Sequence, residues 1–279
     1  MSGREHIRAD FERMVKRPEE SFDLVHAALL VAAEADPSLD VDTELATLTA
    51  WGDELASRME PDWNNLQKLA RLRRFVYEDL GFHGDQKDYF SPENSLLHSV
   101  MRRRIGIPLT LSIIFLTLGW RIGMPLEGVG FPGHFLVRLT GEERELLLDT
   151  FHKGMSVDHA DCAQMLEQIT QGQIPFDESM LAPMTKHDMI ARLLMNLKGA
   201  YLRVKQDEQA LLAVERLLLL HPEDAEQVRD RGLLLYRLRR YQQALEELKA
   251  YLAARPDAND RETVEHHLVS LREILASMN

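Results

Sequence analysis

Residues 105–125, IGIPLTLSIIFLTLGWRIGMP, contain an apolar run bounded by residues that begin and end helices. Pro108 suits the first helical position, where the missing N–H of proline costs no hydrogen bond, and Gly123 suits the position just past the end. The run from Leu109 to Leu118 is apolar on nearly every side. We therefore expect a buried helix rather than an amphipathic surface helix.

The residues that follow change to the pattern of short strands. Segments 126–130, 134–139 and 144–149 are rich in apolar residues that favour strands, and the turn TGEE joins the last two. This arrangement predicts an antiparallel hairpin. His134 begins one strand and Asp149 ends its partner, so antiparallel pairing brings both side chains to the same end. We expect the start of the buried helix to pack there.

This order of helix start, histidine and aspartate resembles the transglutaminase-like branch of the papain-like superfamily. In that family a Gly-x-Cys turn opens the buried helix, and a Gly-Ile-Pro segment follows the helix. Here residues 123–125, GMP, resemble the second segment. The resemblance implies that Pro108 occupies the nucleophile position and that His134 and Asp149 match the histidine and aspartate of the family.

A thiol nucleophile needs a neighbouring imidazole and a helix N-terminus, and proline supplies no thiolate. We therefore expect no catalytic residue, but a remnant site at Pro108, His134 and Asp149. Ser112 is an alternative nucleophile, one helical turn along the same face and about 6 Å deeper. A second alternative nucleophile is a water molecule activated by His134, with Asp149 fixing the tautomer of the imidazole. The His–Asp pair could also be purely structural, tying the hairpin together.

The remaining thiol and imidazole groups indicate no metal site. Cys162, the single cysteine, is expected to be an ordinary small residue on an amphipathic helix, and one cysteine excludes an internal disulfide framework. Four histidines fall in one region but lack the tight spacing of zinc ligands. They are His98, His134, His152 and His159. We expect neither a metal nor a cofactor.

Three further segments narrow the resemblance to one family within this branch. They are GFHGD at 81–85, PENS at 92–95 and FPGHFLVR at 131–138. With them the chain resembles the bacterial Sir-B type of conserved proteins over residues 21–256. Members combine a transglutaminase-like domain with C-terminal tetratricopeptide repeats, and the type member is described as a regulator of invasion-gene expression. The resemblance implies the same architecture here.

The C-terminal part repeats with a fixed period. Pro222 and Pro256 are 34 residues apart, and so are Ala210 and Ala244. This period, with a small residue where two helices cross and a terminal proline, is typical of tetratricopeptide repeats. Two units are fewer than the three usually needed for a continuous core. We therefore expect the helix at 262–278 to act as a cap.

The fold class predicted from these observations is α+β. Apolar stripes at helical spacing predict helices at 22–35, 42–57 and 64–80. The expected domains are an N-terminal helical layer, a transglutaminase-like (papain-like) core and an all-α repeat region with its capping helix. Their boundaries are 1–80, 81–183 and 184–279.

Composition excludes several functions. A net charge of −12 argues against a generic nucleic-acid binder, whose affinity rests on neutralising phosphates. The arginines at 102–104 are a local exception that could hold a carboxylate. The longest apolar run is too short to span a bilayer, and the polar N-terminal residues do not resemble a signal peptide. We expect a cytoplasmic protein that binds neither nucleic acid nor membrane.

The sequence therefore predicts a non-catalytic protein-binding or regulatory module. Its partner is expected to be an unidentified protein or peptide, held by the repeat face or by the remnant cleft. The candidate binding residues are Asn94, Arg104, Tyr201 and Tyr236. The alternative function is that of a hydrolase or acyltransferase using Ser112 or a water activated by His134.

Overall fold

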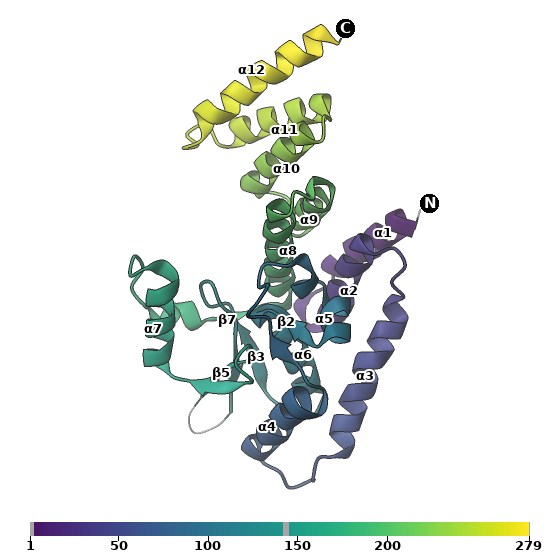
Figure 1. Ribbon diagram of the computed structural model, residues 1–279, viewed down its shortest axis with the longest axis vertical. Coiled ribbons are helices and arrows are strands. Elements are labelled where there is room, and N and C mark those ends of the chain that lie inside the picture. Colours follow the sequence, from purple (N-terminus) through teal and green to yellow (C-terminus); the bar gives the residue numbers. More distant parts are fainter. Residues whose placement is uncertain (1–2, 142–144, 279) are drawn as a thin grey trace. The chain divides into compact units, whose positions relative to one another are not determined.

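The computed structural model describes residues 3–141 and 145–278, and the chain separates into two compact units, Met1–Leu193 and Leu194–Asn279. Figure 1 traces the chain through the helices and strands of both. The expected α+β class, with a helical N-terminal region and an all-helical C-terminal region, is confirmed. The turn at 142–143 and the strand start at 144, both expected from the sequence, lie outside the described residues.

Four helices form the N-terminal region. They are α1 (Gly3–Val15), α2 (Leu24–Ala35), α3 (Val41–Ser57) and α4 (Asn65–Arg74). The last three confirm the helices predicted by the apolar stripes. Each begins after a polar residue whose side chain accepts a hydrogen bond from a backbone N–H of the first turn. These caps are Asp23, Asp40 and Asn64.

The buried helix α6 (Pro108–Arg121) has the ends that the sequence predicts. Every side chain from Pro108 to Leu116 is buried. Gly123 follows the helix in the left-handed region at φ +70°, and its N–H donates to the carbonyl of Trp120. Within the described residues, no helix combines the length and apolar content needed to cross a bilayer.

Short elements lead into α6 and join the rest of the first unit. Helix α5 (Leu97–Arg103) precedes it, and strands β1 (His83–Gly84) and β2 (Ile105–Gly106) pair in parallel. Single 3₁₀ turns occur at Glu19–Ser21, Pro92–Asn94 and Glu178–Leu181. The parallel pair places the loop after β1 beside the segment that opens α6.

The larger sheet has the strand order β6-β5-β4-β3-β7, and its neighbours are antiparallel. Its strands are β3 (Leu126–Val129), β4 (Leu136–Leu139), β5 (Leu146–Asp149), β6 (Met155–Val157) and β7 (Pro183–Met184). The predicted hairpin is confirmed, because Val137 of β4 pairs with Leu148 of β5. His134 lies two residues before β4 rather than within it.

Helices cover both faces of this sheet. Leu126 of β3 meets α6 at Gly119, on one face. Val129 and Leu136 have the opposite orientation, because successive side chains of a strand alternate between faces. They pack in one buried cluster with Cys162 of helix α7 (His159–Thr170). The region around His134 and Asp149 therefore lies at the end of a sheet that is buried on both sides.

Helix α4 continues into a π-helical turn at Phe75–Asp79, which the apolar stripe did not predict. The N–H of Leu80 donates to the carbonyl of Phe75, five residues back, at 2.8 Å. From this turn the hydroxyl of Tyr77 donates to the carbonyl of Thr150 at 3.1 Å. The turn thus ties the helical layer to the residue that follows β5.

The second unit consists of helix pairs. Helix α8 (Lys186–Arg203) crosses the boundary between the units, and four helices follow it. They are α9 (Asp207–Leu220), α10 (Ala225–Arg237), α11 (Tyr241–Ala254) and α12 (Arg261–Ser277). Ala210 and Ala244, the small residues of the predicted repeat, are both fully buried. Helix α12 occupies the place of the predicted cap.

Two charged residues of the repeat helices, Lys198 and Arg231, form ion pairs. Lys198 is buried, and its ammonium group donates to Gln227 Oε1 at 2.8 Å and to Asp230 Oδ2 at 2.9 Å. Arg231 pairs with Glu247 at 2.7 Å. Each of the two charges therefore has a carboxylate partner, although Nε of Arg231 is buried without a hydrogen bond.

Gly119 supplies a test of the packing between α6 and the sheet. An added Cβ would overlap the side chain of Leu126 and lie 3.3 Å from that of Leu72. Gly119→Ala should therefore lower the free energy of unfolding by about 1–3 kcal/mol, the usual cost of overpacking, as measured by urea titration. In contrast, Gly199→Ala places its Cβ where nothing lies within 4 Å and should stabilise its helix. Equal effects would contradict this packing.

Candidate functional site

The structure brings His134 and Asp149 together at one end of the sheet. The two atoms His134 Nε2 and Asp149 Oδ1 are 3.0 Å apart, and the side chains are 11% and 2% exposed. The ring N–H of His134 is not aligned for a hydrogen bond, so the contact is an ion-pair distance only. A small reorientation of the imidazole would be needed for Asp149 to fix its tautomer.

The carboxylate of Asp149 organises the turn that follows β5. Its Oδ1 accepts hydrogen bonds from the backbone N–H groups of Phe151 at 3.0 Å and His152 at 3.3 Å. Its Oδ2 lies 2.8 Å from His152 Nδ1. Burial alone would raise the pKa of this carboxyl, but the interactions with His134 and His152 outweigh burial and hold the pKa below its usual value. The site therefore contains an ionised carboxylate at neutral pH.

Thr150 connects the site to the start of α6. Its hydroxyl donates to the carbonyl of Pro108 at 3.2 Å and lies 2.7 Å from the hydroxyl of Ser112. All three residues are buried. Pro108 is thus hydrogen-bonded to Thr150, the residue next to Asp149. The start of α6 therefore packs at the end of the hairpin.

The side chains that could act as nucleophiles are held elsewhere. Ser112 is fully buried, and its hydroxyl is shared with Thr150 rather than with an imidazole. Cys162 is fully buried in the cluster between the sheet and α7. Burial, followed by the charges of nearby aspartates, raises the pKa of the Cys162 thiol to about 11. Neither side chain is accessible to solvent.

Sequence reasoning considered His152 only among the possible metal ligands and did not place it beside Asp149. Its ring stacks on that of His134, with centroids 6.5 Å apart, and its side chain is 53% exposed. Because Asp149 engages Nδ1, the Nε2 atom is the ring nitrogen left for solvent or a ligand. The sequence signal that could have identified His152 is its spacing of three residues from Asp149. Sequence alone, however, does not show that this segment forms a turn.

The other histidines of the region lie apart from this pair. His98 Nε2 is 3.9 Å from Asp36 Oδ2, and His159 Nδ1 is 3.3 Å from Glu178 Oε1. Among residues 3–141 and 145–278, no group of three or more His, Cys, Asp or Glu side chains is arranged to hold a metal ion. The described residues thus give no arrangement into which a metal could be placed.

Asn94 is fully buried, and both ends of its amide are engaged. Its Nδ2 donates to Asp85 Oδ2 at 3.0 Å and to the carbonyl of Asp88 at 2.7 Å. Its Oδ1 accepts from Arg103 at 3.3 Å. The amide therefore closes the loop that follows β1.

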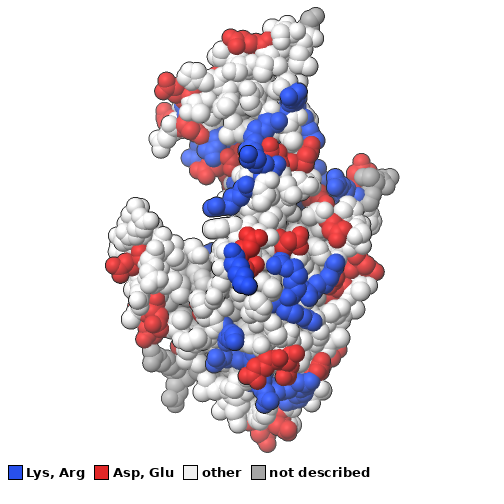
Figure 2. Space-filling model, viewed as in Figure 1, with Lys and Arg blue, Asp and Glu red and all other residues white. Residues whose placement is uncertain are grey.

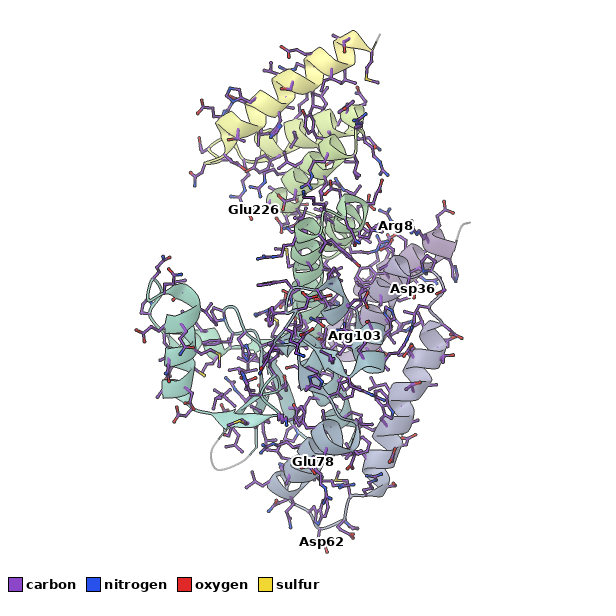
Figure 3. The ribbon with its side chains drawn as sticks, viewed as in Figure 1. Arg8, Asp36, Asp62, Glu78, Arg103 and Glu226 are labelled. Atoms are coloured by element: carbon purple, nitrogen blue, oxygen red, sulfur yellow. The ribbon has the colours of Figure 1, made fainter. Side chains whose placement is uncertain are left out.

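The arginines at 102–104 are each engaged within the first unit. Arg102 lies 3.4 Å from Glu44, and Arg103, labelled in Figure 3, contacts the loop after β1. The guanidinium of Arg104 lies 4.2 Å from the ring centroid of Trp51, and burial lowers the pKa of Arg104. Figure 2 shows Lys and Arg side chains gathered on this face, bordered by acidic ones. Each arginine therefore has a contact within the first unit, although Nη1 of Arg104 is buried without a hydrogen-bond partner.

The two candidate tyrosines of the repeats differ in accessibility. Tyr201 of α8 is buried, at 6% exposed. Tyr236 of α10 is partly exposed, and its ring lies 5.4 Å from that of His267 and 6.0 Å from that of Tyr241. Of the two, Tyr236 is the tyrosine whose ring is partly accessible to solvent.

Comparison with known proteins agrees with this arrangement. Residues 42–195 match the model of the transglutaminase-like superfamily, and residues 197–268 match that of the tetratricopeptide repeat. A UPF0162 protein of Xylella fastidiosa strain Temecula1 is 33% identical over 256 residues, which cover 91% of each chain. One of Vibrio cholerae is 30% identical over 252 residues, covering 88% of this chain and 92% of that protein.

A more distant relative shares only part of the chain. The F-box only protein 21 of Homo sapiens is 36% identical over 110 residues, which are 37% of this chain and 18% of that protein. The fold and the matches together define a transglutaminase-like domain followed by tetratricopeptide repeats, as the resemblance implied. The chain belongs to the UPF0162 family of bacterial proteins.

Removal of the charge on Asp149 tests its role in the turn. Asp149→Asn should lower the free energy of unfolding at pH 7 by about 1–3 kcal/mol, because a buried, multiply bonded acceptor is lost. The pKa of Asp149 is depressed in the folded state, so its contribution is present above the unfolded value, about 3.9, and is lost as pH falls through the folded value. Urea titrations should show the difference from wild type shrinking below about pH 4.

The exposed Asp62, labelled in Figure 3, provides a matched control for that substitution. Asp62→Asn removes the same charge from an exposed loop residue and should change stability by less than about 0.5 kcal/mol. If both variants behave alike at every pH, Asp149 does not organise the turn.

Proposed function

We propose that this protein is a non-catalytic protein-binding module in which a transglutaminase-like domain has lost its nucleophile. The position of Pro108 carries the proposal. It begins α6 beside the His134–Asp149 pair, where the resemblance requires a cysteine, and its carbonyl is occupied by the hydroxyl of Thr150. Proline has neither a nucleophilic atom nor a proton to transfer.

The state of the other candidate nucleophiles supports the same conclusion. Transfer of an acyl group would need a hydroxyl or thiol within hydrogen-bond reach of the imidazole. Ser112 is instead paired with Thr150, and the thiol of Cys162 is buried with a raised pKa. The alternative of a hydrolase or acyltransferase using Ser112 would require the hydroxyl to leave this buried pair.

The repeats supply the binding role. Tetratricopeptide units stack helix pairs into surfaces that hold peptides or partner proteins. Here the pairs are intact, with buried Ala210 and Ala244 at the helix crossings and the partly exposed ring of Tyr236 available for contact. On this proposal the protein acts in the cytoplasm as a regulator through its partner, with the remnant cleft as a second contact surface.

Activity measurements test the absence of catalysis. The full chain should not accelerate hydrolysis or transfer of peptide, amide or ester substrates, and a serine-directed covalent probe should not label Ser112 in the folded protein. His134→Ala is the matched variant for both assays. Turnover that disappears in His134→Ala would overturn the proposal in favour of the hydrolase, whether the attacking group is Ser112 or a water.

Affinity purification tests the binding role. The full chain, used as bait in its native host, should retain a defined partner protein, and the amount of partner retained should rise with the amount of bait. Tyr236→Ala should reduce that retention at least threefold, because an aromatic contact is lost. Lys249→Ala, an exposed change in the same unit, should leave retention unaltered. Equal retention by the two variants would exclude the repeats at Tyr236 as the binding surface.

A further inference from the structure

A surface groove lies beside His152, and the proposed binding role of the repeats does not involve it. It has a volume of about 530 Å³ and lies between strands β1 and β2 and the turn that follows β5. Phe151, Ile105 and Met155 provide its apolar part, and Met155 is 57% exposed. Segments 83–87 and 151–155, distant in sequence, meet there. His83, Gly84 and Asp85, the last three residues of the GFHGD segment, line one wall.

The charges around this groove are predominantly basic. Lys87 and Lys153 line it, with His83 and His152, and in the part of the chain that the structure describes neither ammonium group has an ion-pair partner. Asp85 is the one acid of the lining, at 8% exposed. A basic groove is unusual on a chain with a net charge of −12.

The carboxylate of Asp85 is already used within its own loop. Its Oδ1 accepts from the N–H groups of Lys87 and Asp88, each at 2.9 Å. Its Oδ2 accepts from Asn94 at 3.0 Å. The carboxylate also lies 3.7 Å from the guanidinium of Arg103, which offsets its charge, so the charges of Lys87 and Lys153 are left for a ligand.

The groove is held in shape before any ligand binds. A Cβ on Gly84 would lie 2.5 Å from the ring of Phe151, so only glycine admits that ring. Asp149 fixes the backbone of the turn and the ring of His152. The carbonyl of Lys153 accepts from Arg73 Nε at 3.3 Å. Preorganisation of this kind reduces the entropy lost on binding.

We propose that this groove binds an acidic segment of a partner protein, in which an apolar side chain is flanked by carboxylates. The apolar side chain would contact Phe151 and Met155, and the carboxylates would pair with Lys87 and Lys153. The inference rests on the proposed binding function and names the chemistry of the partner. A nucleic acid fits less well, because the basic groups are few and the rest of the chain is acidic.

A fluorescein-labelled peptide of sequence EEFEE is the probe, and anisotropy with the full chain is the measurement. The double variant Lys87→Glu/Lys153→Glu should weaken binding at least tenfold. The matched control Lys205→Glu/Lys249→Glu makes the same charge change at exposed lysines of the second unit and should weaken it less than twofold. All four lysines are exposed, so folding should be preserved, as circular dichroism will verify.

Two further probes separate the chemical classes. The neutral peptide QQFQQ should bind at least tenfold more weakly than EEFEE. A pentathymidylate of similar charge should not compete with EEFEE at equal concentration. Equal binding of the neutral peptide, equal weakening by the two double variants, or displacement by pentathymidylate would each overturn the proposal.

The outcome is distinguishable from that of the proposed function. If bait from the native host retains a partner and Lys87→Glu/Lys153→Glu retains it equally while failing to bind EEFEE, the groove is not its docking site and this inference alone fails. If wild-type bait retains no partner and the chain instead turns over a substrate, the proposed function fails whatever the peptide result.

Discussion

A single buried carboxylate determines the geometry of this protein's most conspicuous site. Asp149 is almost completely inaccessible, and an ionised group in that position is costly unless it is paired and hydrogen-bonded. Here two backbone N–H groups and two imidazoles surround it. The hydrogen bonds come from Phe151 and His152 of the turn, and His134 adds an ion-pair contact at 3.0 Å, so the carboxylate fixes the turn and the ring of His152 together.

Thr150, the residue that follows β5, has a different role. Its hydroxyl donates to the carbonyl of Pro108 and lies within hydrogen-bond distance of the hydroxyl of Ser112 on α6. Tyr77 adds a hydrogen bond to the backbone of Thr150 from the helical layer. The pair of residues at the end of β5 thus joins the helix start, the hairpin and the N-terminal helices. None of these hydrogen bonds requires a nucleophilic side chain at the start of α6, so the framework holds with Pro108 in that position.

The elements that sequence predicted are those specified by local signals. Pro108 and Gly123 mark the ends of α6, and the spacing of Ala210 and Ala244 marks the repeats, because each signal depends on one residue and its backbone. The role of His152 depends on a turn whose shape comes from Asp149, and the π-helical turn at Phe75–Asp79 has no periodic signature. The spacing of Asp149 and His152 does not show that a turn forms between them, and the π-helical turn is joined through Tyr77 to Thr150, 73 residues away, a contact that one sequence does not reveal.

The position of Cys162 has a practical consequence. It is the only cysteine of the chain, and it is sealed between the sheet and α7 with a thiol that stays protonated near neutral pH. Maleimide chemistry requires an accessible thiolate. A fluorophore or spin label can therefore be attached at one engineered surface cysteine without first deleting the native residue, so distances between chosen points become measurable in an otherwise unaltered chain.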